Sequence, residues 1–363
     1  MDTDQLYTFI APIDETAIII NEKANSLYRK LLKLDLSDTA IDDYGRQYFA
    51  SHHTGNRLFF SIESSADIIY RSVTLSNKTM AELSFTDYGA GLGTLFLLAG
   101  SVGFKQVYFN DYFPQWAGYA RIICNKLDIT MSDYITGDID TLISYGISNN
   151  VRFDIIASRN VVEHIYDLRN FYSKIYRSNR TKVCYATTTA NYHNMAMRLK
   201  HYWYHQKIEN KQFKKQREAY LKEIKPGITP TDLKQLTGLT RGRAFTDFTD
   251  AITAYFAKKP VTPVEFLHTN TCDCKTGVWA ENLITKANYK QIIEDAGFKS
   301  TYTAGFWDTH YNNGFVNLIT KFLNRIIKFT GGKGYYFSPF VNVIACPPTW
   351  PGGQDVLIKT NNE

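Results

Sequence analysis

The spacing of apolar residues divides the chain into regions of different character. In the first 80 residues, side chains such as Leu58, Ile62 and Ile69 recur at helical spacing and predict an N-terminal helical region. From residue 83 onward, short apolar runs alternate with longer amphipathic segments, which is typical of βαβ units and a parallel sheet. The expected strands cover residues 83–88, 106–110, 133–136, 153–157 and 182–186, with helices at 92–99, 115–127 and 167–176.

This alternation is interrupted between about residues 190 and 285. Residues 201–225 predict a polar, basic and aromatic helix that ends at Pro226, and residues 231–256 predict a further pair of helices. The alternation then resumes with a helix at 286–296 and strands at 301–307 and 340–345. The expected parts are an N-terminal helical region (1–80), a sheet core (81–190), an inserted helical cap (191–285) and the end of the sheet domain (286–363).

Composition supports a globular protein and narrows the function only slightly. Hydrophobic residues make up 44% and charged residues 21% of the 363 positions, so the chain can form a core and is not globally disordered. The net charge of +6 is mild, and the basic stretch 207–225 also contains Glu209, Glu218 and Glu223. A solvated helix of mixed charge therefore explains this stretch better than a nucleic-acid site does.

Signals for export, membranes and disulfides are lacking in the sequence. The five cysteines form neither a disulfide framework nor a zinc pattern. The first residues do not resemble a signal peptide, and no apolar run is long enough to span a bilayer. We therefore expect a cytoplasmic protein with reduced thiols and no membrane partner.

The strongest chemical signal is a glycine-rich turn directly after the first expected strand. The turn reads Asp87-Tyr88-Gly89-Ala90-Gly91-Leu92-Gly93. Glycines let the backbone turn sharply and let a ligand approach closely, and a helix N-terminus behind such a turn adds unpaired N–H groups. By itself this motif is weak, because a tight turn without a ligand has the same pattern.

Three further motifs follow the next strands in order. Asp111 ends the second expected strand about twenty residues downstream, which is the spacing of a ribose-binding acid. Asp138 follows the third strand, where a carboxylate can accept a hydrogen bond from an adenine amino group. The fourth strand leads through Asn160 into the pair Glu163-His164. Four such elements in the correct order make a coincidence improbable.

Together these motifs resemble class I S-adenosylmethionine-dependent methyltransferases, in particular the branch with a Glu-His pair after strand four that includes ubiquinone-biosynthesis O-methyltransferases. The resemblance covers residues 80–190 and, more weakly, 285–346. It implies a doubly wound, Rossmann-like α/β fold with a seven-stranded sheet in the order 3-2-1-4-5-7-6, and S-adenosylmethionine as the cofactor. The implied cofactor-binding residues are Asp87, Gly89, Ala90, Gly91, Gly93, Asp111, Tyr112, Asp138, Ile139 and Asn160.

The resemblance also implies where these residues act. The glycine turn and Asp87 surround the methionine moiety, Asp111 holds the ribose hydroxyls, and Tyr112 lies against the adenine. Asp138 and Ile139 read the adenine edge, and Asn160 lies beside the sulfonium.

Two other ligands fit the motifs less well. A dinucleotide pyrophosphate disfavours a carboxylate at the position of Asp87, whereas a methionine ammonium group favours one. Small-RNA 2′-O-methyltransferases hold magnesium with a Glu-x-x-Glu-His motif, but Asn160 stands where their first glutamate belongs. A hard divalent cation prefers several oxygen ligands, so we expect no metal.

His164 and Glu163 are the candidate catalytic residues. A histidine can take a proton from a hydroxyl or amine as it attacks the methyl group, because its ordinary pKa lies near neutral pH. The alternative is that the pair only caps a helix or packs against the cofactor loop, since methyl transfer can proceed by alignment alone.

The cap is the expected substrate-selecting part. Histidines and aromatics at 201–205 could stack on a flat acceptor, and Arg241 and Arg243 could hold a phosphate or carboxylate; alternatively these are core residues and a solvated turn. We expect methyl transfer to an oxygen or nitrogen of a small molecule, aromatic or anionic. The alternatives are an RNA methyltransferase and a non-catalytic nucleotide-binding protein of the same fold. The sequence does not indicate an oligomeric state.

Overall fold

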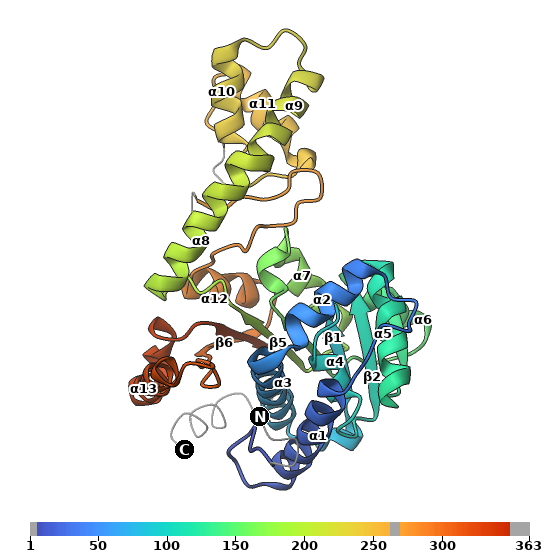
Figure 1. The fold of residues 1–363 in the computed structure, drawn as a ribbon. Coiled ribbons are helices and arrows are strands. Elements are labelled where there is room, and N and C mark those ends of the chain that lie inside the picture. Colours follow the sequence, from blue (N-terminus) through green and yellow to red (C-terminus); the bar gives the residue numbers. More distant parts are fainter. Residues whose placement is uncertain (1–5, 262–268, 349–363) are drawn as a thin grey trace.

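A seven-stranded sheet forms the centre of the computed structural model, which describes residues 6–261 and 269–348. The strand order is β3-β2-β1-β4-β5-β7-β6, which confirms the expected fold class and order (Figure 1). Strands β1 to β5 are parallel, and β7 pairs antiparallel with both β5 and β6. The strands are β1 (Ser84–Tyr88), β2 (Gln106–Asp111), β3 (Asp133–Thr136), β4 (Ile155–Arg159), β5 (Val183–Thr188), β6 (Lys299–Ala304) and β7 (Val341–Cys346).

Helices cover both faces of the sheet, and a separate apolar cluster lies under each layer. A parallel sheet needs this double cover because its strands are buried on both faces, as every residue of β1 and β5 is here. One layer consists of α1 (Glu15–Leu32), α3 (Gly55–Ser76), α4 (Leu95–Ala99) and α5 (Pro114–Leu127). The other consists of α6 (Ile139–Ser148), α7 (Leu168–Ser178) and α12 (Lys286–Asp295).

One helix of the N-terminal region reaches a cavity at the carboxyl ends of the strands. Helix α2 (Asp43–His53) begins at Asp42, whose carboxylate accepts a hydrogen bond from Gly45 N at 2.7 Å. Its residues Tyr48 and His52 line a cavity at the carboxyl ends of the strands. The N-terminal region therefore contributes side chains to the site as well as core packing.

The cap follows β5 and precedes α12 in the chain, and it projects away from the sheet (Figure 1). Its helices are α8 (Met195–Ile208), α9 (Lys214–Ile224), α10 (Pro230–Leu239) and α11 (Phe248–Phe256). A π-helical turn over Glu209–Phe213 joins α8 to α9, so the helix expected at 201–225 is continuous but begins earlier, where Asn194 caps it. The cap has a small apolar core of its own, formed by Leu221, Leu236, Phe248 and Cys274.

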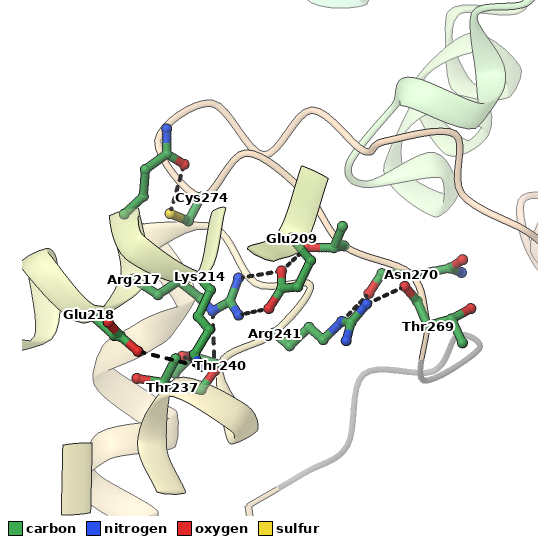
Figure 2. Close-up of polar contacts among 12 residues, drawn as sticks. Glu209, Lys214, Arg217, Glu218, Thr237, Thr240, Arg241, Thr269, Asn270 and Cys274 are labelled. Carbon is green, nitrogen blue, oxygen red and sulfur yellow. Dashed lines mark hydrogen bonds and ion pairs between the residues drawn. The ribbon is translucent and has the colours of Figure 1, made fainter. Parts of the chain in front are cut away.

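Buried polar contacts organise the cap, as Figure 2 shows. Arg217 has 1% of its side chain exposed and pairs with Glu209 across the π-helical turn. Arg241 donates hydrogen bonds to the carbonyl oxygens of Thr269 at 2.6 Å and Asn270 at 3.2 Å. The guanidinium of Arg241 is therefore used inside the cap, which argues against its expected role as a substrate anchor.

Several element boundaries differ from those expected. Helix α4 begins at Leu95 and not at residue 92, because Gly93 N donates to Ala90 O and closes a turn first. Strand β6 ends at Ala304, three residues before the expected end. Two helices were not expected, α6 after β3 and α13 (Gly314–Thr330) between β6 and β7. Short helical turns are formed by Met80–Glu82, Val162–His164, Phe245–Asp247 and Gly331–Tyr336.

Candidate active site

A cavity of about 140 Å³ lies at the carboxyl ends of β1 and β4. Such edges, where the order of a parallel sheet reverses, are the usual ligand sites of doubly wound folds. The cavity is lined by Tyr48, His52, Asp87, Gly89, Ala90, Gly93, Leu95, Arg159 and Asn160. Five of these lining residues belong to the set expected from the sequence, whereas Tyr48, His52, Leu95 and Arg159 do not.

The glycine turn requires glycine for steric reasons. Gly89 and Gly91 have φ values of 69° and 50°, which side chains rarely allow. A Cβ atom on Gly89 would lie 2.6 Å from Cγ2 of Val161, in the loop after β4. The turn therefore runs directly beside the β4 loop, and the cavity lies where these two segments meet.

Asp87 and Arg159 place opposite charges on this cavity. Asp87 is 2% exposed, and burial raises its pKa to about 7 although the charge of Arg159 opposes the shift. Helix α3 holds the guanidinium of Arg159, which donates to the carbonyl of Ser61 and the hydroxyl of Ser64 at 2.8 and 2.9 Å. A ligand with both an ammonium and a carboxylate group would suit this pair of charges.

The side chain of Asp111, at the end of β2, is hydrogen-bonded to the glycine turn. Its Oδ2 atom accepts from Gly91 N at 2.9 Å, and its Oδ1 atom accepts from Phe113 N at 3.0 Å. Burial raises its pKa, and these backbone hydrogen bonds oppose the rise. Tyr112 is 66% exposed, so its ring has a free face beside this carboxylate. Each carboxylate oxygen retains a second lone pair for a ligand hydroxyl.

Asp138 and Ile139 lie at the end of β3, where α6 begins. Asp138 is the N-cap of that helix, and its Oδ1 atom accepts from Asp140 N and Thr141 N, both at 3.1 Å. The adenine contact expected of Asp138 must therefore use its Oδ2 atom, because Oδ1 already satisfies the helix.

Asn160 connects the loops after β4 and β5. Its φ of 56° is left-handed, its backbone N donates to Thr187 O at 2.8 Å, and its Oδ1 atom accepts from Thr189 N at 3.1 Å. This conformation turns the chain away from the sheet immediately after Arg159. It places Asn160 on the cavity wall.

Glu163 and His164 follow in a short helical turn and are not among the residues that line the cavity. Glu163 has 0% of its surface exposed, and burial raises its pKa to about 7, with opposing contributions from His164 and Thr188. Nδ1 of His164 lies 2.7 Å from the carbonyl oxygen of Trp279. Since a carbonyl only accepts, Nδ1 carries a proton, and in the neutral imidazole Nε2 has the lone pair that can act as a base.

The cap contributes a histidine–carboxylate pair next to these residues. Nδ1 of His201 lies 2.8 Å from Oε2 of Glu281, and its Nε2 lies 3.0 Å from the carbonyl oxygen of Thr189. Burial raises the pKa of Glu281, but the hydrogen bond and charge of His201 outweigh it and leave that pKa below its usual value. Glu281 is electrostatically coupled to the Glu163-His164 turn, since His164 also lowers the pKa of Glu281 and Glu281 raises that of Glu163. Across the described ranges 6–261 and 269–348, no cluster of His, Cys, Asp or Glu side chains has the geometry of a metal site.

The central part of the chain is similar in sequence to a known protein family. Residues 86–182 match the sequence model of a family described as a methyltransferase domain. No curated protein matches the chain.

Several solved structures are similar to the chain at low identity. Magnesium protoporphyrin IX methyltransferase from Synechocystis PCC 6803, solved with bound SAH, has a TM-score of 0.37 and 12% identity over 84% of this chain and 93% of that one. A putative sarcosine dimethylglycine methyltransferase from Galdieria sulphuraria has a TM-score of 0.37 and 10% identity over 90% and 98%. A putative SAM-dependent methyltransferase from Streptococcus mutans has a TM-score of 0.28 and 15% identity over 34% of this chain and 35% of its own.

Proposed function

We propose that this enzyme, a methyltransferase with S-adenosylmethionine as its cofactor, transfers the methyl group to an oxygen or nitrogen atom of a small-molecule acceptor. The observation that carries the proposal is the cavity at the ends of β1 and β4, where a buried carboxyl group and a guanidinium lie beside a glycine turn. The carboxyl group and the guanidinium fit the methionine end of the cofactor, which bears one ammonium and one carboxylate group.

In this proposal the cofactor lies along the carboxyl ends of β1, β2 and β3. Asp87 pairs with the ammonium group and Arg159 with the carboxylate. Asp111 accepts hydrogen bonds from the ribose hydroxyls, and Asp138 accepts one from the adenine amino group. Tyr112 and Ile139 enclose the adenine ring, and Asn160 lies at the sulfonium end. The fixed order of these strands in the sheet supports the sequence of contacts.

The proposed chemistry is in-line attack of the acceptor oxygen or nitrogen on the donor methyl carbon, which breaks the carbon–sulfur bond and releases S-adenosylhomocysteine. S-adenosylmethionine supplies an electrophilic methyl group when it is bound. Nε2 of His164 takes the proton of the attacking hydroxyl or amine, because its Nδ1 proton is committed to the carbonyl of Trp279. Glu163 and the His201–Glu281 pair set the charge around this imidazole.

A groove at the foot of the cap supports a small aromatic or anionic acceptor. The groove encloses about 450 Å³ and is lined mainly by residues of the segment 192–202. This segment comes shortly after β5 in the chain. The guanidinium of Arg198 lies over the ring of Tyr192 at 4.7 Å, so the groove offers both a cation and aromatic faces. RNA is less well supported, because Arg217 of the basic stretch is buried against Glu209.

The first test concerns the cofactor. S-adenosylhomocysteine should raise the melting temperature and NAD should not, since a ligand that binds only the folded chain stabilises it by mass action. Thermal unfolding with saturating amounts of each compound makes the comparison. No shift with S-adenosylhomocysteine, or a larger one with NAD, would refute the proposed site.

The second test separates catalysis from structure at His164. His164→Asn keeps an N–H group for the carbonyl of Trp279 but has no base, so it should retain S-adenosylhomocysteine binding and lose about 10²–10⁴-fold in turnover. Turnover is measured with labelled donor on a fractionated pool of metabolites, alongside His164→Ala. If the asparagine variant keeps wild-type turnover, His164 only positions the loop and alignment alone carries the reaction.

A further inference from the structure

Helix α13 carries an apolar face that the other residues described in the structure leave uncovered. Within the helix, Phe315, Leu318, Phe322 and Phe329 are 69%, 65%, 60% and 93% exposed. At 100° per residue these four side chains fall on one narrow stripe. Single exposed apolar residues are ordinary, but a continuous stripe of large ones marks an interaction surface.

The side of α13 that packs against the protein combines half-buried apolar residues, such as Leu323 and Ile327, with polar ones. Asn324 exchanges two hydrogen bonds with the backbone of Trp307, at 2.7 and 2.9 Å. Asn317 does the same with Tyr311, at 2.7 and 2.8 Å. Only Thr320 is buried in this helix. A surface helix normally exposes a polar face, whereas α13 carries a second apolar stripe on its exposed side.

Positive charge lies directly beside the apolar stripe. Lys321, Arg325 and Lys328 follow at helical spacing on the adjoining side of α13. The sequence contains no acidic residue between Asp308 and Asp355. Large apolar side chains next to a row of basic ones are the signature of helices that lie in the interface of an anionic membrane.

The helix also lies at the edge of the sheet that holds the active site. Strand β6 is parallel to β5, since both pair antiparallel with β7, so its carboxyl end meets the same edge. The segment after β6 contacts the start of α3, where the ring of His310 lies 3.9 Å from that of Phe59. The same helix α3 holds Arg159 in the cavity. In Figure 1, α13 lies at the periphery of the molecule beside β6.

We propose that α13 docks the enzyme onto the surface of an anionic lipid bilayer, with its apolar stripe in the acyl boundary and its basic row against the headgroups. The helix lies on the membrane and does not cross it: in the part of the chain that the structure describes, no helix is long and apolar enough to span a bilayer. A second copy of the chain is a poorer occupant, because a two-fold interface would bring two rows of like charge together.

The test uses the full chain and vesicles of phosphatidylcholine with or without roughly one third phosphatidylserine. The protein should sediment with the anionic vesicles and not with the neutral ones, and added salt should weaken the binding. The double variants Leu318→Glu/Phe322→Glu and Lys321→Glu/Arg325→Glu should each lose about tenfold or more in vesicle affinity.

Matched controls carry the same chemical changes elsewhere. Ile18→Glu/Ile147→Glu removes two comparably exposed apolar side chains, on α1 and α6, and Lys211→Glu/Lys215→Glu makes the same charge reversal on the cap. Both controls should bind vesicles like the parent chain, and all variants should bind S-adenosylhomocysteine. Failure of the parent to bind anionic vesicles overturns the proposal. So does a stable dimer that Leu318→Glu/Phe322→Glu dissociates, with no vesicle binding. The readout is independent of methyl transfer.

Discussion

Single residues in this site combine burial with charge. Asp87 and Glu163 are both almost fully buried, and burial raises the pKa of each to about 7. Their ionisation is therefore sensitive to changes near neutral pH, where an exposed carboxylate would stay charged. The two acids differ in surroundings, because Asp87 faces the guanidinium of Arg159 and Glu163 does not.

The raised pKa of Asp87 predicts a dependence of cofactor binding on pH. If its carboxylate pairs with the ammonium of the ligand, binding requires the ionised form. The affinity for S-adenosylhomocysteine should then rise with pH, by up to tenfold per unit below about pH 7, and level off above it. Asp87→Asn should bind more weakly and lose this pH dependence. Titration calorimetry at several pH values measures both, and an unchanged slope in the variant would contradict the pairing.

Glu163 should make the folded chain less stable as the pH rises, whereas the cofactor affinity due to Asp87 should increase with pH. Its pKa is about 7 in the folded chain and 4.5 in the unfolded one, so the folded state binds more protons between these values. Its contribution to the free energy of unfolding is therefore fully favourable below about pH 4.5 and falls by about 3 kcal/mol as pH rises through about 7. Glu163→Gln should remove that decrease.

Urea unfolding at about pH 5 and about pH 8 checks the effect of Glu163→Gln. Asp87 contributes a separate decrease in the same pH range, so Asp87→Asn serves as the comparison and the double variant should show the sum. An equal loss of stability with pH in parent and Glu163→Gln would mean that Glu163 ionises normally.

Local motifs made some of these residues predictable from the sequence. The glycine turn, Asp87 and Asn160 lie within short segments whose chemistry is readable in order, and the structure brings them to one cavity. Arg159 was missed because its partner Ser61 lies 98 positions earlier. Tyr48 was missed for the same reason, since nothing in its own segment indicates that α2 reaches the cavity.

At the level of elements, the glycine turn and α5 offer a matched pair of substitutions. Gly89→Ala should be destabilising by more than about 1 kcal/mol and weaken cofactor binding, because its φ is positive and its Cβ would meet Val161. Gly118→Ala lies inside α5 with no atom within 4 Å of its Cβ and should stabilise the chain by about 0.5–1 kcal/mol. Thermal unfolding compares the two, and similar effects would argue against a tight turn.

The elements themselves were predictable to different degrees. Strands β1 to β5 were expected within two residues because buried parallel strands are short, apolar and bounded by polar residues. Helix α13 was missed although Phe315, Leu318, Phe322 and Phe329 are visibly periodic. The expectation of no membrane partner rests on the lack of a bilayer-spanning apolar run, and that criterion does not detect an amphipathic helix that lies on a membrane surface.

On the scale of the whole molecule, the sheet order could be expected from the family resemblance, but the position of the cap could not. Its helices are predictable from breakers such as Pro226 and Pro230. Its placement depends on contacts between distant segments, for example His201 on α8 with Glu281 and the carbonyl of Thr189. The contact with Thr189 attaches α8 to the loop after β5, and the contact with Glu281 connects the two ends of the cap.

The antiparallel strand β7 has a consequence for how the protein is made. Synthesis delivers β1 to β5 first, yet the outer edge of β5 pairs only with β7, which follows the cap, β6 and α13. Until the ribosome has released Val341–Cys346, β5 presents an open row of backbone donors and acceptors along a strand that is fully buried in the folded protein. A nascent chain that stalls within the cap would therefore recruit other chains through β5 and aggregate, and would not survive as a shorter methyltransferase.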